Sequence, residues 1–211
     1  MNILILGATG ATGVQLVQQA LAKGHEVTAM VREPGKVAAR PQLTVVKGNV
    51  TSTAEVAAAL RGHEAVLSTL GPRAKTDPIC ALAAEAVVTA MKQEGVKRLI
   101  WLSASGVGDS RAPIDKASFV FGRIIIPLLL ARPYANHLRA EEIVRASELE
   151  WTVLRPLQLV DAPTGKPAVA VATTPTAMLG GLKIARQDLA TFMLGELEAR
   201  AWLQQMPMVH A

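Results

Sequence analysis

The sequence predicts an α/β fold in which a doubly wound, mostly parallel sheet forms a single domain over residues 1–211. Three observations lead to this prediction. Short apolar runs that suit buried strands alternate with longer stretches whose apolar residues recur at helical spacing. A glycine-rich turn joins the first strand-like run to the first helical stretch. No internal repeat or linker interrupts the alternation.

The first element is a strand over residues 1–6, followed by the run Gly-Ala-Thr-Gly-Ala-Thr-Gly at 7–13 and a helix over 14–21. Gly7 allows a sharp turn after the strand, Gly10 lets backbone approach a pyrophosphate, and Gly13 lets the helix pack close to the sheet. The helix N-terminus offers unpaired N–H groups and a partial positive charge. The layout predicts a Rossmann-like dinucleotide site.

The remaining elements follow in order along the chain. Apolar β-branched runs predict strands over 25–32, 43–49, 64–70, 97–103 and 151–156, and 169–172 is a candidate for one more. Helical spacing predicts helices over 54–60, 78–94, 135–147 and 188–200. Asp188 suits the first turn of the last helix because a carboxylate is favourable near a helix N-terminus.

Two segments, near 106–133 and 161–184, do not fit the alternation. Both follow strands on the side of the sheet where ligands bind in such folds, so they are candidates for the substrate pocket and its lid. The first is too apolar to be left in water as one patch. We expect part of it to be helical and to cover the pocket or meet another subunit. The residues concerned are Phe119, Val120, Phe121, Ile124 and Ile125.

Composition excludes several classes of protein. The net charge is +5, but only 3% of residues are aromatic and there is no basic run, so no nucleic-acid partner is expected. The single cysteine, Cys80, excludes an intramolecular disulfide and is expected in the core. A strand begins at residue 1, which leaves no room for a signal peptide, and the apolar run 124–130 is too short to span a bilayer. We expect a soluble, cytoplasmic monomer or weak homodimer without a membrane partner.

The end of the second strand indicates which nicotinamide cofactor is preferred. An acidic residue there would bind the ribose 2′-hydroxyl, whereas this chain has Arg32, with Lys36 one turn later. A guanidinium can pair with a 2′-phosphate and stack on adenine. The sequence therefore predicts NADP(H), with the neighbouring Glu33 softening the preference.

Hydroxyl groups follow the fifth strand, at Ser103 and Ser105. They would face the nicotinamide and could hydrogen-bond a substrate carbonyl or the carboxamide. The Tyr-x-x-x-Lys pair that donates a proton in many reductases is absent, because the only tyrosine, Tyr134, is followed four residues later by Leu138. No Cys, His and Asp set has metal-ligand spacing, so no metal is expected.

These motifs resemble the atypical short-chain dehydrogenase/reductases, in particular the biliverdin-IXβ reductase/flavin reductase type, with the NmrA-like NAD(P)-binding proteins next. The resemblance covers nearly the whole chain. It rests on residues 7–13, 31–36, 48–50, 70–73, 90–92, 102–105 and 186–190.

The resemblance implies a set of cofactor-binding residues. The pyrophosphate would be lined by Gly7, Thr9, Gly10, Ala11, Thr12 and Gly13. Arg32 and Lys36 would hold the 2′-phosphate, and Asn49 and Val50 would lie by the adenine. The remaining cofactor surface would be Thr69, Leu70, Gly71, Arg73, Ser103 and Ala104. Ser105 or Ser103 would stand where the family has its catalytic serine. The reductase type has a histidine where this chain has Gln158, which puts biliverdin itself in doubt as substrate.

The missing Tyr/Lys pair has a chemical consequence. Reduction of a simple ketone needs a proton placed on the developing alkoxide, whereas a flavin or quinone delocalises the charge and solvent can supply the proton. The first hypothesis is therefore an NADPH-dependent reductase of a planar conjugated acceptor. The alternatives are a non-catalytic NADP(H)-sensing NmrA-like regulator that binds a protein partner, and a sugar-nucleotide epimerase or dehydratase.

Overall fold

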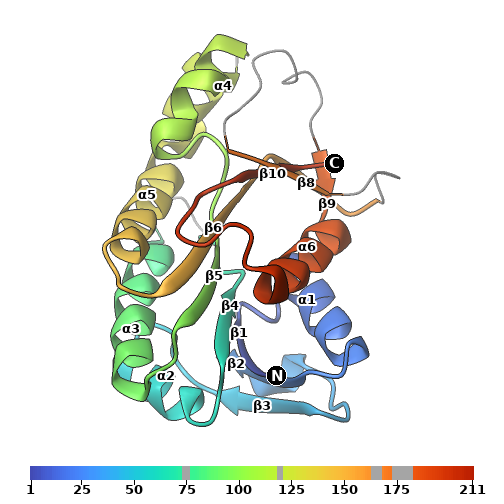
Figure 1. The fold of residues 1–211 in the computed structure, drawn as a ribbon. Helices are drawn as coiled ribbons and strands as arrows, with labels where there is room; N and C mark the ends of the chain where they lie inside the picture. The colour runs from blue at the N-terminus through green and yellow to red at the C-terminus, as the bar shows by residue number, and fades with distance from the viewer. Residues whose placement is uncertain (73–76, 118–120, 163–167, 173–182) are drawn as a thin grey trace.

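The computed structural model describes residues 1–72, 77–117, 121–162, 168–172 and 183–211, and its central feature is a twisted sheet covered by helices on both faces (Figure 1). The strand order is β3-β2-β1-β4-β5-β6-β10-β8. All neighbouring strands are parallel except β10 and β8, which run antiparallel. The predicted α/β, Rossmann-like, mostly parallel sheet is confirmed.

The strands of this sheet are short and mostly buried. They are β1 (Asn2–Leu6), β2 (Glu26–Val31), β3 (Leu43–Lys47), β4 (Ala65–Ser68), β5 (Arg98–Leu102), β6 (Glu150–Pro156), β8 (Val169–Val171) and β10 (Met208–His210). A separate parallel pair is formed by β7 (Gln158–Val160) and β9 (Lys183–Ala185).

The helices divide between the two faces of the sheet. The first face carries α2 (Thr53–Leu60), α3 (Ile79–Glu94) and α5 (Ala131–Arg145), and the second carries α1 (Ala11–Ala22) and α6 (Arg186–Ala199). Shorter helical pieces are η1 (Pro34–Lys36), η2 (Gly108–Ser110), α4 (Arg111–Ala117) and the π-helix η3 (Phe121–Leu130).

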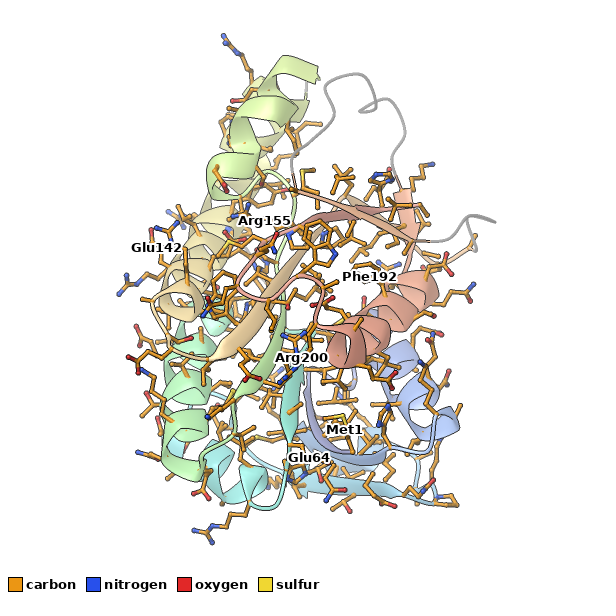
Figure 2. The ribbon with its side chains drawn as sticks, in the orientation of Figure 1. Met1, Glu64, Glu142, Arg155, Phe192 and Arg200 are labelled. Atoms are coloured by element: carbon orange, nitrogen blue, oxygen red, sulfur yellow. The ribbon has the colours of Figure 1, made fainter. Side chains whose placement is uncertain are left out.

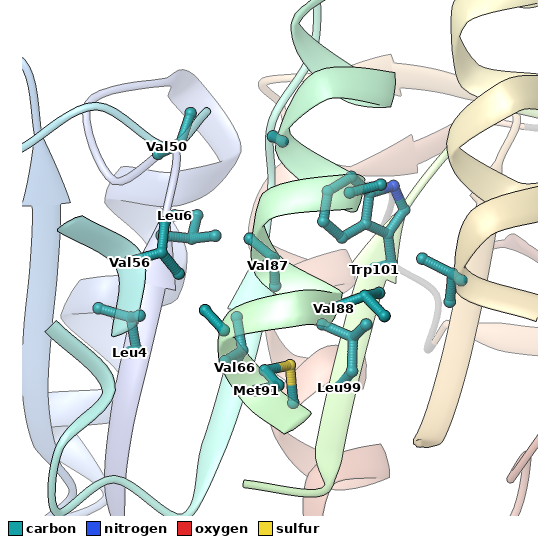
Figure 3. Packing of buried hydrophobic residues seen from close by; sticks show 14 of the residues in the cluster. Leu4, Leu6, Val50, Val56, Val66, Val87, Val88, Met91, Leu99 and Trp101 are labelled. Carbon is teal, nitrogen blue, oxygen red and sulfur yellow. The ribbon is translucent and has the colours of Figure 1, made fainter. Parts of the chain in front are cut away.

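A buried apolar layer lies on each face because successive strand residues point to opposite sides of the sheet. Leu4 and Leu6 on β1 lie beside Val56 of α2, and Leu99 and Trp101 on β5 lie beside Val88 of α3 (Figure 3). The alternate residues of the same strands face α1 and α6. Cys80 is fully buried in the first layer, and burial raises the pKa of its thiol to about 12, so it is a core residue as expected.

The sequence missed three short strands, of which β10 matters most. Met208 pairs with Arg155 and Val209 with Pro156, so the C-terminal residues extend the main sheet beyond β6. A three-residue strand is too short for apolar alternation to reveal it.

The two irregular segments are partly described. The 106–133 segment contains η2, α4 and η3, which confirms that part of it is helical. In the 161–184 segment, β8 and the start of β9 are described. Phe119 and Val120 lie outside the described residues, as do 163–167 and 173–182.

Candidate functional site

A cavity of about 530 Å³ lies at the carboxyl ends of β1, β2, β3 and β4. Ligands of doubly wound sheets bind at this edge. Among the predicted site residues, those that line the cavity are Gly7, Thr9, Gly10, Ala11, Thr12, Arg32, Lys36, Asn49, Val50, Thr69, Leu70 and Gly71.

Two glycines of the first turn are needed by the fold itself. Gly7 has a φ of +81°, and a Cβ there would lie 2.8 Å from Thr69 Oγ1. A Cβ at Gly13 would overlap the Gly7 carbonyl, so only glycine allows α1 to approach β1 this closely. Gly13 packs against the turn and does not line the cavity.

Gly10 is different because the space next to it is the cavity. A Cβ at Gly10 would come within 4 Å of the Gly7 carbonyl oxygen alone, at 3.3 Å. Gly10 also caps α1, whose first turn has neither a side-chain cap nor an acidic residue. The N–H groups and partial positive charge of this helix terminus are therefore left for an anion. This cradle fits a pyrophosphate.

One end of the cavity carries two cations. Arg32 directly follows β2, and Lys36 ends η1. Lys36 Nζ lies 3.0 Å from Glu33 Oε2, and both side chains are exposed. Because Glu33 pairs with Lys36, the Arg32 guanidinium keeps no ion-pair partner among the described residues. Arg40 lines an adjoining hollow of about 280 Å³ together with Lys36.

The loop after β3 presents an amide to the cavity. Asn49 Oδ1 accepts hydrogen bonds from the Thr51 backbone N–H at 3.1 Å and from Thr51 Oγ at 2.9 Å. These bonds fix the side chain and leave the Asn49 NH₂ group as a donor for a ligand. Gly48 precedes it where a Cβ would overlap the Met30 side chain.

Residues after β4 complete the described wall. The Thr69 hydroxyl lies 3.1 Å from the Leu6 carbonyl oxygen and 3.3 Å from that of Gly7, so it ties this loop to the glycine turn. Leu70 and Gly71 line the cavity, whereas Arg73 lies outside the described residues.

Several lining residues were not predicted from the sequence. Arg186, the first residue of α6, reaches the cavity, and its Nη1 donates to Asp161 Oδ1 at 2.6 Å. In the sequence, Arg186 stands out only because residues 186–190 are among those that resemble the atypical short-chain reductases, and that resemblance gives Arg186 no role. The others are Ala8, Met30, Val31, Glu33, Gly48, Pro72, Asp77 and Ile79.

The two candidate catalytic serines differ in their hydrogen bonding. Ser105 Oγ donates to the Arg155 carbonyl oxygen at 2.7 Å, and the residue is 3% exposed. Ser103 Oγ is buried with no hydrogen-bond partner among the described residues. Neither serine lines the described cavity, and neither does Ala104.

A buried ion pair supports the serine loop. Arg155, labelled in Figure 2, lies on β6. It donates through Nε to Glu141 Oε1 at 2.9 Å and through Nη2 to Glu141 Oε2 at 2.7 Å. Its Nη1 donates to Asp109 Oδ1 at 2.6 Å. Burial lowers the pKa of Arg155, but the hydrogen bonds and negative charges of Glu141 and Asp109 outweigh burial, so the pKa is raised. The guanidinium is therefore charged, and it joins β6, α5 and η2 behind Ser105.

The only tyrosine of the sequence uses its hydroxyl in a hydrogen bond to the backbone. Tyr134 Oη donates to the Ser105 carbonyl oxygen at 3.0 Å, and burial raises the pKa of the phenol. The nearby His137 is buried, and burial lowers its pKa to about 4, so its imidazole is neutral at pH 7. Within the described ranges no cluster of His, Cys, Asp and Glu could hold a metal ion, and no helix is long and apolar enough to span a membrane.

Comparison with known proteins agrees with this geometry. The model of a family described as NAD(P)H-binding matches residues 7–200. A curated relative is an uncharacterized chloroplastic protein of Arabidopsis thaliana, 28% identical over 177 residues, which are 78% of this chain and 61% of the relative. The chain thus spans less than two thirds of that relative.

Two solved structures are similar over the full chain. ChuY of Escherichia coli O157:H7, described as an anaerobilin reductase, is 26% identical with a TM-score of 0.78, covering 100% of this chain and 97% of ChuY. A short-chain dehydrogenase/reductase of Veillonella parvula in complex with NADP is 18% identical with a TM-score of 0.82, covering 100% and 94%. At 18% identity, the similarity to the Veillonella parvula structure shows a shared fold and no more.

Proposed function

Because this chain belongs to the NAD(P)H-binding family, we propose that it is an NADPH-dependent reductase that transfers hydride to a planar conjugated acceptor such as a flavin, a quinone or a biliverdin-like pigment. The observation that carries the NADPH assignment is the pair of cations, Arg32 and Lys36, on the wall of a cavity whose glycine turn fits a pyrophosphate. Membership of the family indicates an NAD(P)H cofactor but does not distinguish NADPH from NADH.

Arg32 is proposed to bind the 2′-phosphate. Its guanidinium is exposed at the end of β2, and the neighbouring Glu33 forms an ion pair with Lys36. A fork of N–H donors can hold two phosphate oxygens at once, and hydrogen bonds to charged groups contribute about 1.5–3 kcal/mol. Lys36 adds a second positive charge, although its pairing with Glu33 reduces that contribution.

On the acceptor side, Ser103 is the better candidate of the two serines. Its hydroxyl is buried just beyond the carboxyl end of β5, without a hydrogen-bond partner in the described part of the chain. A buried hydroxyl in that state is destabilising until a ligand accepts or donates a hydrogen bond. We propose that Ser103 orients the acceptor or the carboxamide, while Ser105 holds the loop through Arg155. NADPH, when bound, supplies the hydride.

We favour a conjugated acceptor because the residues that the structure describes near these serines include no tuned proton donor. Tyr134 uses its hydroxyl on a backbone carbonyl and has no lysine four residues later. An acceptor that spreads the incoming charge over a conjugated system can take its proton from solvent. The full-length similarity to ChuY, an anaerobilin reductase, supports reduction as the reaction class.

The test is a steady-state assay of NADPH oxidation against free flavins, quinones and bilin pigments, with calorimetric binding of NADPH and NADH alongside. We expect NADPH to bind more tightly than NADH and at least one conjugated acceptor to be reduced. Tight NADPH binding with no turnover on any acceptor would contradict the reductase proposal and favour the NADP(H)-sensing alternative. Turnover on simple ketones alone would contradict the acceptor class.

A further inference from the structure

The end of the 106–133 segment presents apolar side chains to solvent. Leu128 is 74% exposed, Leu129 50% and Ile124 42%, and Leu138 on the adjoining α5 is 37% exposed. Ile126, in the same helical segment, is buried instead and packs with Ile114 and Met208. We call the exposed part, residues 123–139, the apolar rim. A cluster of this kind on a protein surface indicates an interaction site.

The same stretch carries most of the chain's excess positive charge. Residues 123–139 contain Arg123, Arg132 and Arg139 and no aspartate or glutamate, so they contribute three positive charges to the net charge of +5. Arg132 is exposed at the start of α5. Arg139 Nη1 pairs with Glu142 Oε2 at 3.3 Å.

We propose that the apolar rim attaches this protein to the surface of an anionic lipid bilayer. Leucine and isoleucine side chains would enter the boundary between headgroups and acyl chains, while the arginines face the negatively charged headgroups. Apolar burial and charge attraction act together in such binding, and the rim supplies both. A second copy of the chain is the weaker occupant, because pairing two rims would bring like charges together.

Attachment to a surface is distinct from spanning the membrane. The expectation that the protein has no membrane partner rested on the shortness of the apolar run 124–130, and length bears only on spanning. What the sequence could not provide was the direction of each side chain. In the structure the side chains of Leu128 and Leu129 are exposed to solvent. Shallow insertion into a bilayer surface requires exposed apolar side chains and does not require a segment long enough to span the membrane. The inference does not depend on the reductase function.

The test is co-sedimentation of the full chain with vesicles, at low and high salt. We expect binding to vesicles of phosphatidylcholine mixed with phosphatidylglycerol, and weak binding to phosphatidylcholine alone. High salt should weaken binding to the anionic vesicles, because it screens the headgroup charge. No binding to the anionic vesicles at low salt would overturn the proposal, as would equal binding to both compositions.

Matched variants locate the binding surface. Leu128→Glu should lower vesicle affinity more than tenfold by removing apolar burial and adding a repelled charge, and Arg132→Gln should lower it about fivefold. Leu82→Glu on α3 is the control for the leucine, because Leu82 is 45% exposed. Arg61→Gln is the control for the arginine, because the Arg61 side chain is 75% exposed. Both controls should bind like the wild type.

Two results would assign the rim otherwise. Equal loss of binding in Leu128→Glu and Leu82→Glu would show that affinity does not reside in the rim. A dimer in size-exclusion chromatography that Leu128→Glu dissociates, without vesicle binding by the wild type, would show that a second copy occupies it. Thermal melting of each variant separates these outcomes from misfolding.

Discussion

The two halves of the sheet's carboxyl edge are built in different ways. On the nucleotide half, residues 7–10 join β1 to α1, and the cavity wall includes glycines and the cations Arg32, Lys36 and Arg186. On the half proposed to take the acceptor, residues 103–130 separate β5 from α5, and the buried ion pair between Arg155 and Glu141 joins β6 to α5. A nucleotide is recognised through close backbone contact, which restricts the sequence strongly. An acceptor pocket can be built from many sequences, so it leaves little trace in motifs.

The largest expected effect falls on the acceptor half. Arg155→Met leaves Glu141, whose side chain is 2% exposed, as an unpaired buried charge, which should destabilise the protein by about 3–5 kcal/mol in urea unfolding. The control is the double variant Arg155→Met with Glu141→Met, which removes both charges and should recover part of that loss. If the single variant is as stable as the wild type, the ion pair does not hold this half together.

On the nucleotide half, Gly10→Val should abolish detectable NADPH binding without unfolding the protein. The valine side chain would occupy the space over the helix N-terminus, while the fold meets it only at the Gly7 carbonyl, 3.3 Å from the new Cβ. Calorimetric titration and circular dichroism together measure this. Gly13→Val is the comparison variant, which we expect to destabilise the fold itself because its Cβ overlaps the Gly7 carbonyl. Normal NADPH affinity in Gly10→Val would place the cofactor elsewhere.

Arg32→Glu tests the cation end of the cavity. It should weaken NADPH binding by about 1.5–3 kcal/mol, the range for hydrogen bonds to charged groups, and should leave NADH affinity nearly unchanged. Arg40→Glu, in the adjoining hollow, provides a matched control for a general loss of positive charge. Equal affinities of the wild type for the two cofactors would contradict the assignment of Arg32.

This contrast also explains how far the sequence could predict the molecule. The alternation of apolar runs was enough for the fold, and Gly7, Gly10 and Arg32 could be placed by their distance from the first two strands. Arg186 could not, because its approach to the cavity depends on where α6 docks. β10 is only three residues long, so its place beside β6 depends on tertiary packing alone. The difference between Ser103 and Ser105 could not be predicted either, because it depends on the Arg155 carbonyl of β6, to which Ser105 Oγ donates.

The serine pair should separate catalysis from stability. Ser103→Ala should lower kcat by roughly tenfold to a hundredfold, as expected for one lost transition-state hydrogen bond, with little change in unfolding free energy. Ser105→Ala should instead lower stability by about 1 kcal/mol, because it removes the bond to the Arg155 carbonyl. Steady-state kinetics and urea unfolding on both variants measure this. The reverse pattern would return the catalytic role to Ser105.

The smallest effect on turnover is expected at Tyr134, and it decides whether the acceptor half carries a hidden proton donor. Its hydroxyl donates to the Ser105 carbonyl at 3.0 Å, and its ring packs so closely on Gly106 that a Cβ there would lie 2.9 Å from Tyr134 Cε2. Tyr134→Phe keeps the ring and removes one hydrogen bond. Stability should therefore fall by about 0.5–1.5 kcal/mol, while kcat changes less than about twofold. The pH profile of kcat should also stay unchanged, since burial raises the pKa of the phenol and keeps it protonated at neutral pH. A complete loss of activity with normal NADPH binding would show that Tyr134 delivers a proton, and the acceptor would then be a simple carbonyl.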